Sequence, residues 1–373
     1  MSTYIVQPGD TIYSIARKHS LTTHEFVSLN PGIMERGLLV GEKVQLPPPQ
    51  GRPTIETNGY VYPNTAQAYL GELYPYLTYL SIIGNRITQP GFLIGVNNKE
   101  LIEAARQANV APMMVVSNTT ENGLFSSALA HAVMNSPSAR ERLISNIVTA
   151  VDENDYYGAN IDFEFVSPEN FPAYINFLLK LKDTLHEQNH TMFLVVRIAT
   201  ILSEQTSIAQ LLPLGEYEDL ADRFIIRTNE WACNVNLDAP LLDLAQQAVD
   251  FATELVSADK LIVGIPNCCF HAQLPYQSQI SPTPLSIIEA ERIAVEAGAS
   301  FQLDSRSGAS YFRYFDDAGK ENIIWCPNRC TSQSILELVR IYGLGGVSFR
   351  MVDDFPITDY QSLGAIFNIQ KVM

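Results

Sequence analysis

The stretch YGANIDFEFV, residues 157–166, alternates apolar and polar side chains in the way that a β-strand does. Successive side chains of a strand point to opposite faces, so one face would carry the apolar Ala159, Ile161 and Phe163. The opposite face would carry an amide and two carboxylates, those of Asn160, Asp162 and Glu164. Carboxylates are costly to bury without partners, so we expect this face to point at a ligand. A structural polar layer is the alternative interpretation.

The chain around this strand alternates strand-like runs with amphipathic helical runs from residue 54 to residue 373. Eight strands separated by helices predict an α/β fold, a (β/α)8 TIM barrel, with a doubly wound sheet as the alternative. The expected strands are 59–63, 79–83, 111–117, 159–165, 193–199, 223–228, 260–266 and 346–352. About 80 residues separate the last two strands, so we expect a small α+β insertion between strands 7 and 8, at about 268–325.

A proline-rich stretch, PPPQGRP at 47–53, predicts a linker at 49–53 between a first unit, 1–48, and the barrel, 54–373. The first unit has a βααβ pattern and resembles a LysM module. The residues that carry this resemblance are Tyr4, Val6, Gly9, Asp10, Thr11, Ile15, Ala16, Asn30, Pro31, Leu39, Gly41 and Pro47. LysM modules bind glycans that contain N-acetylglucosamine, and the alternative is a small module without a ligand. The resemblance implies that two loops grip the glycan, formed by Gly9, Asp10, Thr11 and Ile12 and by Asn30, Pro31, Gly32 and Ile33.

Composition excludes several classes of partner. A net charge of −16 argues against binding to nucleic acid or to an anionic membrane, because both need clustered Lys and Arg. No apolar run reaches the length of about 18 residues that a membrane span needs, and the N-terminus lacks the features of a secretory signal. The odd count of five cysteines predicts thiols in a reducing compartment rather than a disulfide framework. We expect a monomer.

No metal or cofactor is expected from the sequence. HEQNH at 186–190 has the letters of a zinc-protease motif, but it lies at the polar end of a helix. Cys268 and Cys269, with Cys326 and Cys330, have loose spacing for a thiolate metal site, so buried thiols are the preferred interpretation.

The opening stretch also resembles the DxxDxDxE signature of glycoside hydrolase family 18. In that family the last Glu protonates the glycosidic oxygen, and the preceding Asp orients the 2-acetamido group of the substrate, which attacks the anomeric carbon. The resemblance therefore implies that Glu164 is the general acid/base and Asp162 the orienting carboxylate. Two signature positions depart from the pattern, with Tyr157 and Asn160 in place of Asp. Asn160 can still hydrogen-bond Asp162, but it cannot share a proton with it.

Three arginines occupy positions where the family has other residues. Arg227 and Asn229 replace the Met and Tyr of the sixth strand, Arg350 replaces a Trp on the eighth, and Arg197 replaces a small residue on the fifth. If the arginines point inward, they either pair with the two carboxylates and keep Glu164 ionised, or bind an anionic ligand such as the lactyl or peptide carboxylates of peptidoglycan. A third interpretation is that one or two point outward into solvent.

The full set of predicted substrate-binding residues is Asn160, Arg197, Arg227, Asn229, Glu230, Trp231, Asn267 and Arg350. Together with the LysM pattern, the barrel resembles the spore-cortex peptidoglycan hydrolases of spore-forming bacteria. This resemblance implies an N-acetylglucosaminidase that acts on peptidoglycan and lies in the outer spore layers after synthesis in the mother-cell cytoplasm. The alternatives are a catalytically inactive glycan-binding or spore-coat protein and a hydrolase of chitin-type oligosaccharides.

Overall fold

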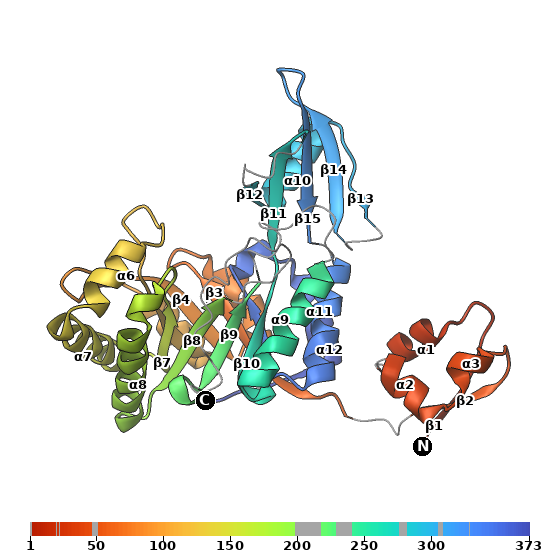
Figure 1. Ribbon diagram of the computed structural model, residues 1–373, viewed down its shortest axis with the longest axis horizontal. Coiled ribbons are helices and arrows are strands. Elements are labelled where there is room, and N and C mark those ends of the chain that lie inside the picture. The colour runs from red at the N-terminus through yellow and green to blue at the C-terminus, as the bar shows by residue number, and fades with distance from the viewer. Residues whose placement is uncertain are drawn as a thin grey trace. The chain divides into compact units, whose positions relative to one another are not determined.

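The computed structural model describes residues 2–19, 21, 23–46, 51–197, 218–228, 241–275, 282–304, 309–327 and 329–373. The chain divides into two compact units, Met1–Pro53 and Thr54–Met373, each of which is described by itself (Figure 1).

The N-terminal unit is built on a two-stranded antiparallel sheet, in which Tyr4 of β1 pairs with Val44 of β2. Its strands and helices are β1 (Ser2–Ile5), α1 (Ile12–Lys18), α2 (Thr23–Leu29), α3 (Ile33–Arg36) and β2 (Lys43–Leu46). The apolar side chains of Ile15, Phe26 and Ile33 are buried in its core. The predicted βααβ order is confirmed, and the single turn α3 is an addition that the sequence analysis did not anticipate.

The second unit contains a closed barrel of eight parallel strands, so the predicted TIM barrel is confirmed. The barrel strands are β3 (Thr54–Val61), β4 (Tyr79–Thr88), β6 (Ala111–Ser117), β7 (Gly158–Asp162), β8 (Thr191–Arg197), β9 (Arg223–Arg227), β10 (Leu261–Ile265) and β16 (Gly346–Phe349). They pair in that order, and the pairing of β3 with β4, which brings Asn58 opposite Tyr79, closes the ring. Two short strands extend it, β5 (Phe92–Ile94) beside β4 and β17 (Asn368–Ile369) beside β3.

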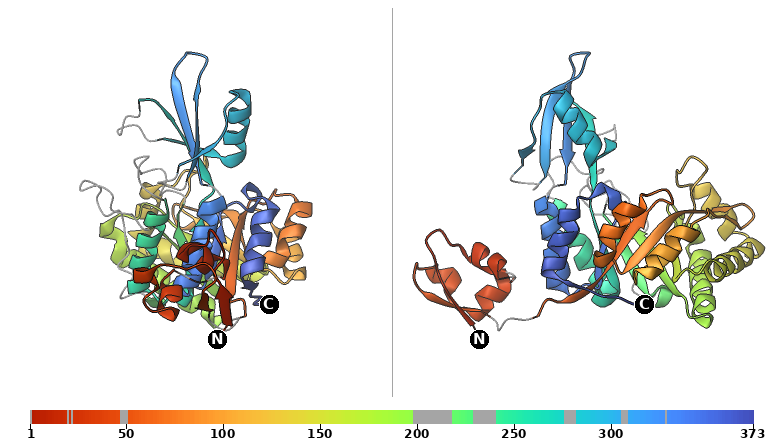
Figure 2. Two further views of the ribbon diagram at one scale, coloured as in Figure 1. Left: turned by 90° about the vertical axis from the view of Figure 1, so that its right-hand side faces the viewer. Right: turned by 180° about the vertical axis from the view of Figure 1, so that it is seen from behind.

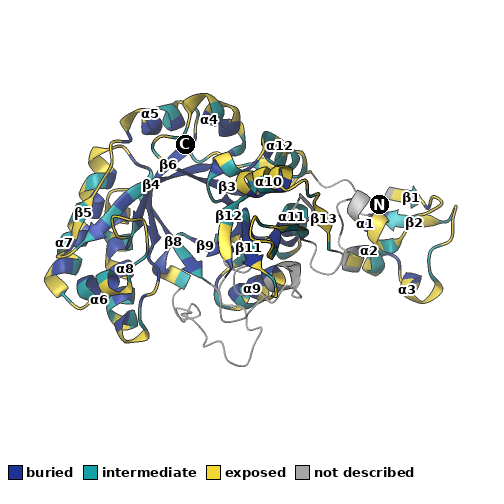
Figure 3. Cartoon of the chain, turned by 90° about the horizontal axis from the view of Figure 1, so that it is seen from above, coloured by how far each residue is buried: buried dark blue, intermediate teal, exposed yellow. Residues whose placement is uncertain are grey.

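Helices surround the barrel strands, and Figure 3 shows the buried strands enclosed by helices whose outer faces are exposed. These helices are α4 (Gln67–Leu73), α5 (Lys99–Gln107), α6 (Ser127–Met134), α7 (Pro137–Glu153), α8 (Phe171–Glu187), α9 (Leu241–Leu255), α11 (Arg329–Tyr342) and α12 (Ile357–Ile366). Amphipathic sequence places their apolar sides on the strands, as in α7, where Leu143 and Ile147 are buried.

The alternation of β7 separates two cores. Ala159, Ile161 and Phe163 lie in the layer between strands and helices, and the ring of Phe163 stacks on that of Tyr174 in α8 at 5.8 Å. The polar face of the strand points into the barrel, toward an interior that is apolar at its base. That interior cluster includes Tyr60, Tyr79, Met113, Val115, Phe193, Ile225 and Ile262.

An insertion lies between β10 and β16, as the sequence predicts. It is a five-stranded antiparallel sheet with one helix, and its elements are β11 (Cys268–Gln273), β12 (Thr283–Ser286), α10 (Ile287–Glu296), β13 (Gln302–Leu303), β14 (Ser310–Phe315) and β15 (Glu321–Cys326). Because β11 begins just after β10 ends, the insertion stands at the carboxyl end of that barrel strand (Figure 2).

The base of the insertion carries a disulfide between Cys269 and Cys326, whose Cα atoms are 4.2 Å apart. The expectation of buried thiols was wrong for this pair. The two residues are 57 positions apart in the chain, and the antiparallel pairing of β11 with β15, in which Phe270 lies opposite Trp325, brings them together. Cys268 is a free thiol.

Candidate active site

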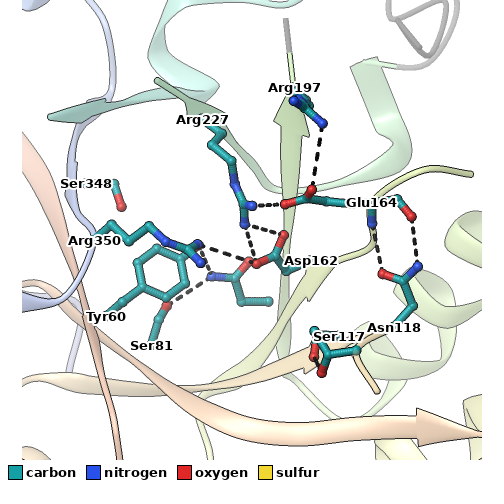
Figure 4. Close-up of polar contacts among 12 residues, drawn as sticks. Tyr60, Ser81, Ser117, Asn118, Asp162, Glu164, Arg197, Arg227, Ser348 and Arg350 are labelled. Carbon is teal, nitrogen blue, oxygen red and sulfur yellow. Dashed lines mark hydrogen bonds and ion pairs between the residues drawn. The ribbon is translucent and has the colours of Figure 1, made fainter. Parts of the chain in front are cut away.

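Two carboxylates meet at the carboxyl end of β7, inside the barrel mouth (Figure 4). Asp162 is the last residue of the strand and Glu164 follows two residues later; they are 4% and 8% exposed. The next residue, Phe165, has a positive φ of 56°, which is uncommon for a non-glycine residue and typical of functional sites. The chain therefore turns away directly after it delivers Glu164 to the interior.

The backbone of Glu164 is held by a side chain that the sequence analysis missed. Asn118, which follows β6, accepts a hydrogen bond from the Glu164 N–H at 2.9 Å and donates one to the Glu164 carbonyl at 2.8 Å. Asn118 is fully buried. A polar residue directly after a predicted barrel strand was the signal that could have identified it.

Arg227 links the two carboxylates. It is the last residue of β9, and its Nη2 donates to both oxygens of Asp162, at 2.7 and 2.6 Å. Its Nη1 makes an ion pair with Oε1 of Glu164, and its guanidinium lies 5.3 Å from the centre of the Phe125 ring. Because Arg227 is buried, these two carboxylates compensate its charge.

Two more arginines approach the pair from opposite sides (Figure 4). Nη1 of Arg197, at the end of β8, lies 3.8 Å from Glu164 Oε2, and Nη1 of Arg350, which follows β16, lies 3.9 Å from Asp162 Oδ2. The side chain of each is 33% exposed. All three arginines therefore point toward the carboxylates, and the interpretation that some of them point into solvent was wrong.

Asn160 has a different role from the one expected. Its Nδ2 donates to the Tyr60 hydroxyl at 2.9 Å and to the Ser81 hydroxyl at 3.0 Å, rather than to Asp162. Its side chain is completely buried below the carboxylates. Burial, reinforced by the negative charge of Asp162, raises the pKa of Tyr60 well above its usual value, so this hydroxyl stays neutral. Asn160 therefore belongs to the polar layer below the carboxylates, and its contact with substrate stays a prediction.

The same polar layer continues to the neighbouring strands. Ser81 donates to Asn58 Oδ1 at 2.7 Å, and Asn58 Nδ2 donates to Ser348 at 2.9 Å. The layer joins β7, β3, β4 and β16 across the interior, and it separates the carboxylates from the apolar base.

Asn267, predicted to bind substrate, holds a loop through its side-chain amide. Its Nδ2 donates to the backbone carbonyl of Arg350 at 2.5 Å and to Asp354 Oδ2 at 3.0 Å. Burial, followed by the neighbouring charge of Asp353, raises the pKa of Asp354. The side chain of Asn267 is 5% exposed, so its contribution is to hold the turn that carries Arg350.

The remaining predicted residues of the barrel mouth, Asn229, Glu230 and Trp231, lie outside the described residues. His186 of the HEQNH stretch contacts the carboxylate of Asp222 at 3.0 Å on the outside of the barrel.

In the N-terminal unit, several side chains of the predicted glycan loops hold the module together. Asp10 Oδ2 accepts hydrogen bonds from the N–H of Gln7 and from the hydroxyl of Tyr4, at 2.7 and 2.9 Å. The Asn30 amide bonds to backbone atoms of Phe26 and Gln45, and Ile33 is fully buried. The loops bend at two positive-φ glycines, Gly9 and Gly32, and Thr11 and Pro31 are exposed. The side chains of Asn30 and Ile33 are therefore buried within the module, and the glycan contacts of the two loops stay a prediction.

Each of the two units matches a known protein family. Residues 54–353 match the model of glycosyl hydrolases family 18, and residues 4–47 match the LysM domain. The chain belongs to glycosyl hydrolases family 18. It is a glycosidase with an N-terminal LysM domain, and these two domains point to a glycan that contains N-acetylglucosamine as its substrate.

Relatives of this family 18 chain include the cortical fragment-lytic enzyme of Bacillus subtilis, which is 27% identical, with 100% of this chain and 99% of the relative covered. Among solved structures, the spore cortex-lytic enzyme SleL of Bacillus cereus matches with a TM-score of 0.79 at 22% identity, covering 100% of this chain and 88% of that one. A chitinase from Chromobacterium violaceum matches with a TM-score of 0.71 at 21% identity, covering 83% and 98%. Among the described residues, no helix is both long and apolar enough to span a bilayer.

Proposed function

We propose that this glycosidase hydrolyses an N-acetylglucosamine-containing glycan of peptidoglycan, with the spore cortex as its source. The observation that carries the proposal is the pair of buried carboxylates, Asp162 and Glu164, side by side at the carboxyl end of β7, where TIM barrels place their chemistry. The names of the relatives and the LysM domain support the choice of substrate. By the same reasoning the protein lies in the outer layers of the spore.

In the proposed reaction, protonated Glu164 donates its proton to the glycosidic oxygen as the bond from that oxygen to the anomeric carbon breaks. The carbonyl oxygen of the substrate's own 2-acetamido group forms a bond to the anomeric carbon, which gives an oxazolinium intermediate. Asp162 accepts a hydrogen bond from the N–H of the acetamido group and stabilises the positive charge of the oxazolinium intermediate. Water then attacks the anomeric carbon and gives a proton back to Glu164, while the bond from the acetamido oxygen to that carbon breaks. Two successive inversions leave the product with the configuration of the substrate.

Arg227 sets the conditions for this reaction. A carboxylate has room for about four hydrogen bonds, so Asp162 can keep both contacts with Arg227 Nη2 and still accept the acetamido N–H. Glu164, in contrast, must give up its ion pair with Nη1 to carry a proton. The proposal therefore requires the ligand to separate Arg227 from Glu164 while Arg227 stays on Asp162.

The test is release of reducing ends from purified cortex fragments by the full chain and by Glu164→Gln. We expect the substitution to lower kcat by at least about 10²-fold, the contribution of a general acid, with little change in fragment binding. Asp162→Asn should lower kcat as well, because the amide cannot carry the negative charge. Absence of cleavage by the wild-type chain, with binding intact, would contradict the proposal and would mean that the Arg227 ion pairs lock the carboxylates.

A further inference from the structure

The backbone of Glu164 lies beyond the regular pairing of its strand. The pairing of β6 with β7 ends at Ser117 and Asp162, and Glu164 follows two residues after Asp162. A buried backbone N–H or C=O group without a partner is costly, so both groups of Glu164 need partners from outside the strand ladder. A side chain provides them.

That side chain is Asn118, which follows β6 (Figure 4). Its Oδ1 accepts a hydrogen bond from the Glu164 N–H at 2.9 Å, and its Nδ2 donates to the Glu164 carbonyl at 2.8 Å. The planar amide takes the place of a neighbouring strand, because it offers one acceptor and one donor in a fixed geometry. Any shift or rotation of the Glu164 backbone therefore breaks one or both bonds.

Asn118 is itself fixed on its other side. Its Nδ2 also donates to the carbonyl of Ser126 at 3.0 Å, and its own carbonyl accepts from the Ser126 N–H at 3.0 Å. Ser126 is the N-cap of α6, and its hydroxyl accepts from the N–H of Leu129. Asn118 thus ties the backbone of Glu164 to the start of a helix that packs around the barrel.

The backbone conformation that follows Glu164 indicates that this arrangement serves the site. Among the described residues, five non-glycine residues have a positive φ. Three of them are Asn or Asp, which adopt this conformation more readily than other residues do. The other two are Phe165 and Met351, and they directly follow Glu164 and Arg350. Such conformations cluster at active sites, where surrounding contacts hold them.

The same arrangement therefore occurs on both sides of the barrel mouth. The strands β7 and β16 are four places apart in the ring of eight, so the residues that follow them stand on opposite sides. Asn267 follows β10, the neighbour of β16, and donates to the Arg350 carbonyl at 2.5 Å, as Asn118 does to that of Glu164. In both cases an asparagine after one strand holds the charged residue after the next strand.

We propose that Asn118 is a positioning residue for hydrolysis, which fixes the backbone of Glu164 so that its carboxyl group reaches the glycosidic oxygen. The inference rests on the proposed function, because it takes Glu164 as the proton donor. A misplacement of about 1 Å in a reacting group can cost about 10²-fold in rate. Asn118 acts through Glu164, so its loss should be felt in the transition state and not in substrate binding.

The experiment compares Asn118→Leu with Asn98→Leu in the full chain. Leucine has the branched shape of asparagine without its hydrogen-bonding groups. Asn98 is the matched control, because it is also buried and its Nδ2 donates to the Tyr156 hydroxyl at 2.7 Å in the core between strands and helices. With cortex fragments, at a temperature where circular dichroism shows all chains folded, Asn118→Leu should lower kcat at least about tenfold with KM unchanged, and Asn98→Leu should keep the wild-type kcat.

Asn118→Asp is a second variant and adds a pH readout. A protonated carboxyl group can accept from the Glu164 N–H and donate to the Glu164 carbonyl, as the amide does, whereas an ionised one can only accept. Relative to the wild type, kcat/KM of Asn118→Asp should therefore fall as the pH rises from about 5 to about 9, the range in which buried carboxyl groups titrate.

The leaving group separates positioning of the acid from general damage to the site. Nitrophenol departs from a glycoside without a proton from the enzyme, whereas a sugar hydroxyl needs one. In Asn118→Leu, the loss of kcat/KM should be about tenfold larger for a sugar leaving group than for a nitrophenyl glycoside of N-acetylglucosamine. Glu164→Gln should show the same pattern.

Two results would overturn the inference while the proposed function stands. They are cleavage of cortex fragments by Asn118→Leu at the wild-type rate, and equal losses on the two leaving groups. If the wild-type chain cleaves no fragments, the proposed function fails instead, and hydrogen exchange tests the hold of Asn118 on Glu164. Exchange in residues 163–170 should then be faster in Asn118→Leu than in Asn98→Leu, and equal exchange would overturn the inference as well.

Discussion

At the scale of single residues, Arg227 determines how the two carboxylates behave. A buried guanidinium cannot lose its proton, so it must have anionic partners, and Asp162 and Glu164 are both within reach. The ion pair between Arg227 and Glu164 favours the negative charge of Glu164, whereas a general acid must start protonated. The pH dependence of catalysis should therefore change when Arg227 is replaced.

We predict that Arg227→Met moves the alkaline limb of the pH–rate profile to higher pH. Activity falls on that limb as the general acid loses its proton, and a carboxyl group without a neighbouring cation keeps its proton to higher pH. A shift of about one pH unit is the low end of what a single opposite charge produces. The measurement is kcat/KM for cortex fragments between pH 4 and 9, roughly the range in which perturbed carboxyl groups titrate.

Arg227→Lys is the control for this prediction. Lysine keeps the positive charge but not the planar fork, so its alkaline limb should stay close to that of the wild type. An unchanged limb in Arg227→Met would mean that Arg227 leaves Glu164 as soon as a ligand binds and has no influence on its proton.

At the scale of elements, the insertion is a small sheet in which the Cys269–Cys326 disulfide joins the neighbouring strands β11 and β15. The bond closes a loop with a sequence separation of 57. In the chain-entropy description such a crosslink stabilises by about 4 kcal/mol, as an upper value. Burial raises the pKa of the adjacent Cys268 thiol to about 11, so at neutral pH this thiol stays protonated and does not attack the disulfide.

We predict that the double substitution Cys269→Ser and Cys326→Ser loosens the insertion and leaves the barrel intact. The barrel is closed by its own strand pairing, whereas the insertion has a small core of its own, which includes Phe312 and Ile324. Hydrogen exchange followed by mass spectrometry should show faster exchange in β11 and β15 and unchanged protection in β6 to β8. Cys268→Ser serves as the control, and equal exchange in the two variants would contradict a stabilising role for the disulfide.

At the scale of the whole barrel, the two ends have different functions. The carboxyl ends of the strands carry the carboxylates and arginines of the site. Near the amino ends, Arg223 on β9 reaches across to Glu56 on β3 with two parallel hydrogen bonds, of 2.6 Å from Nε and 2.8 Å from Nη2. Hydrogen bonding to Glu56 raises the pKa of Arg223. This pair links two strands that are three places apart in the ring, at the end of the barrel away from the carboxylates.

We predict that Glu56→Ala lowers the free energy of unfolding by about 3 kcal/mol, because it leaves Arg223 unpaired against a largely buried site. The double substitution Glu56→Leu and Arg223→Met should recover most of that loss. Urea unfolding measures both, and kcat/KM at 25 °C should remain that of the wild type.

An exposed ion pair gives the comparison. Lys180 and Glu141 form an ion pair on the outer surface. Glu141→Ala should lower the free energy of unfolding by less than about 1 kcal/mol. If Glu56→Ala lowers the free energy of unfolding no more than Glu141→Ala does, the pair of Glu56 and Arg223 does not stabilise the barrel.

Much of the fold followed from local pattern, because strand and helix periodicities are set by neighbouring residues. The eight barrel strands, the insertion and the two-helix core of the N-terminal module were predicted close to where they lie. The inward direction of Asp162 and Glu164 followed as well, since the side chains of a strand alternate strictly. The structure differs from the predictions where a contact joins segments that are far apart in the chain.

The sequence by itself determined the barrel, the carboxylate pair and the presence of arginines at the ends of three other strands. Only the tertiary structure decided that Arg227 bridges the carboxylates, that Asn160 bonds to Tyr60 and Ser81 instead of Asp162, and that Asn267 holds Arg350. The reason is register: which side chains meet across a closed barrel depends on the stagger of strands far apart in the chain, and no local pattern encodes it.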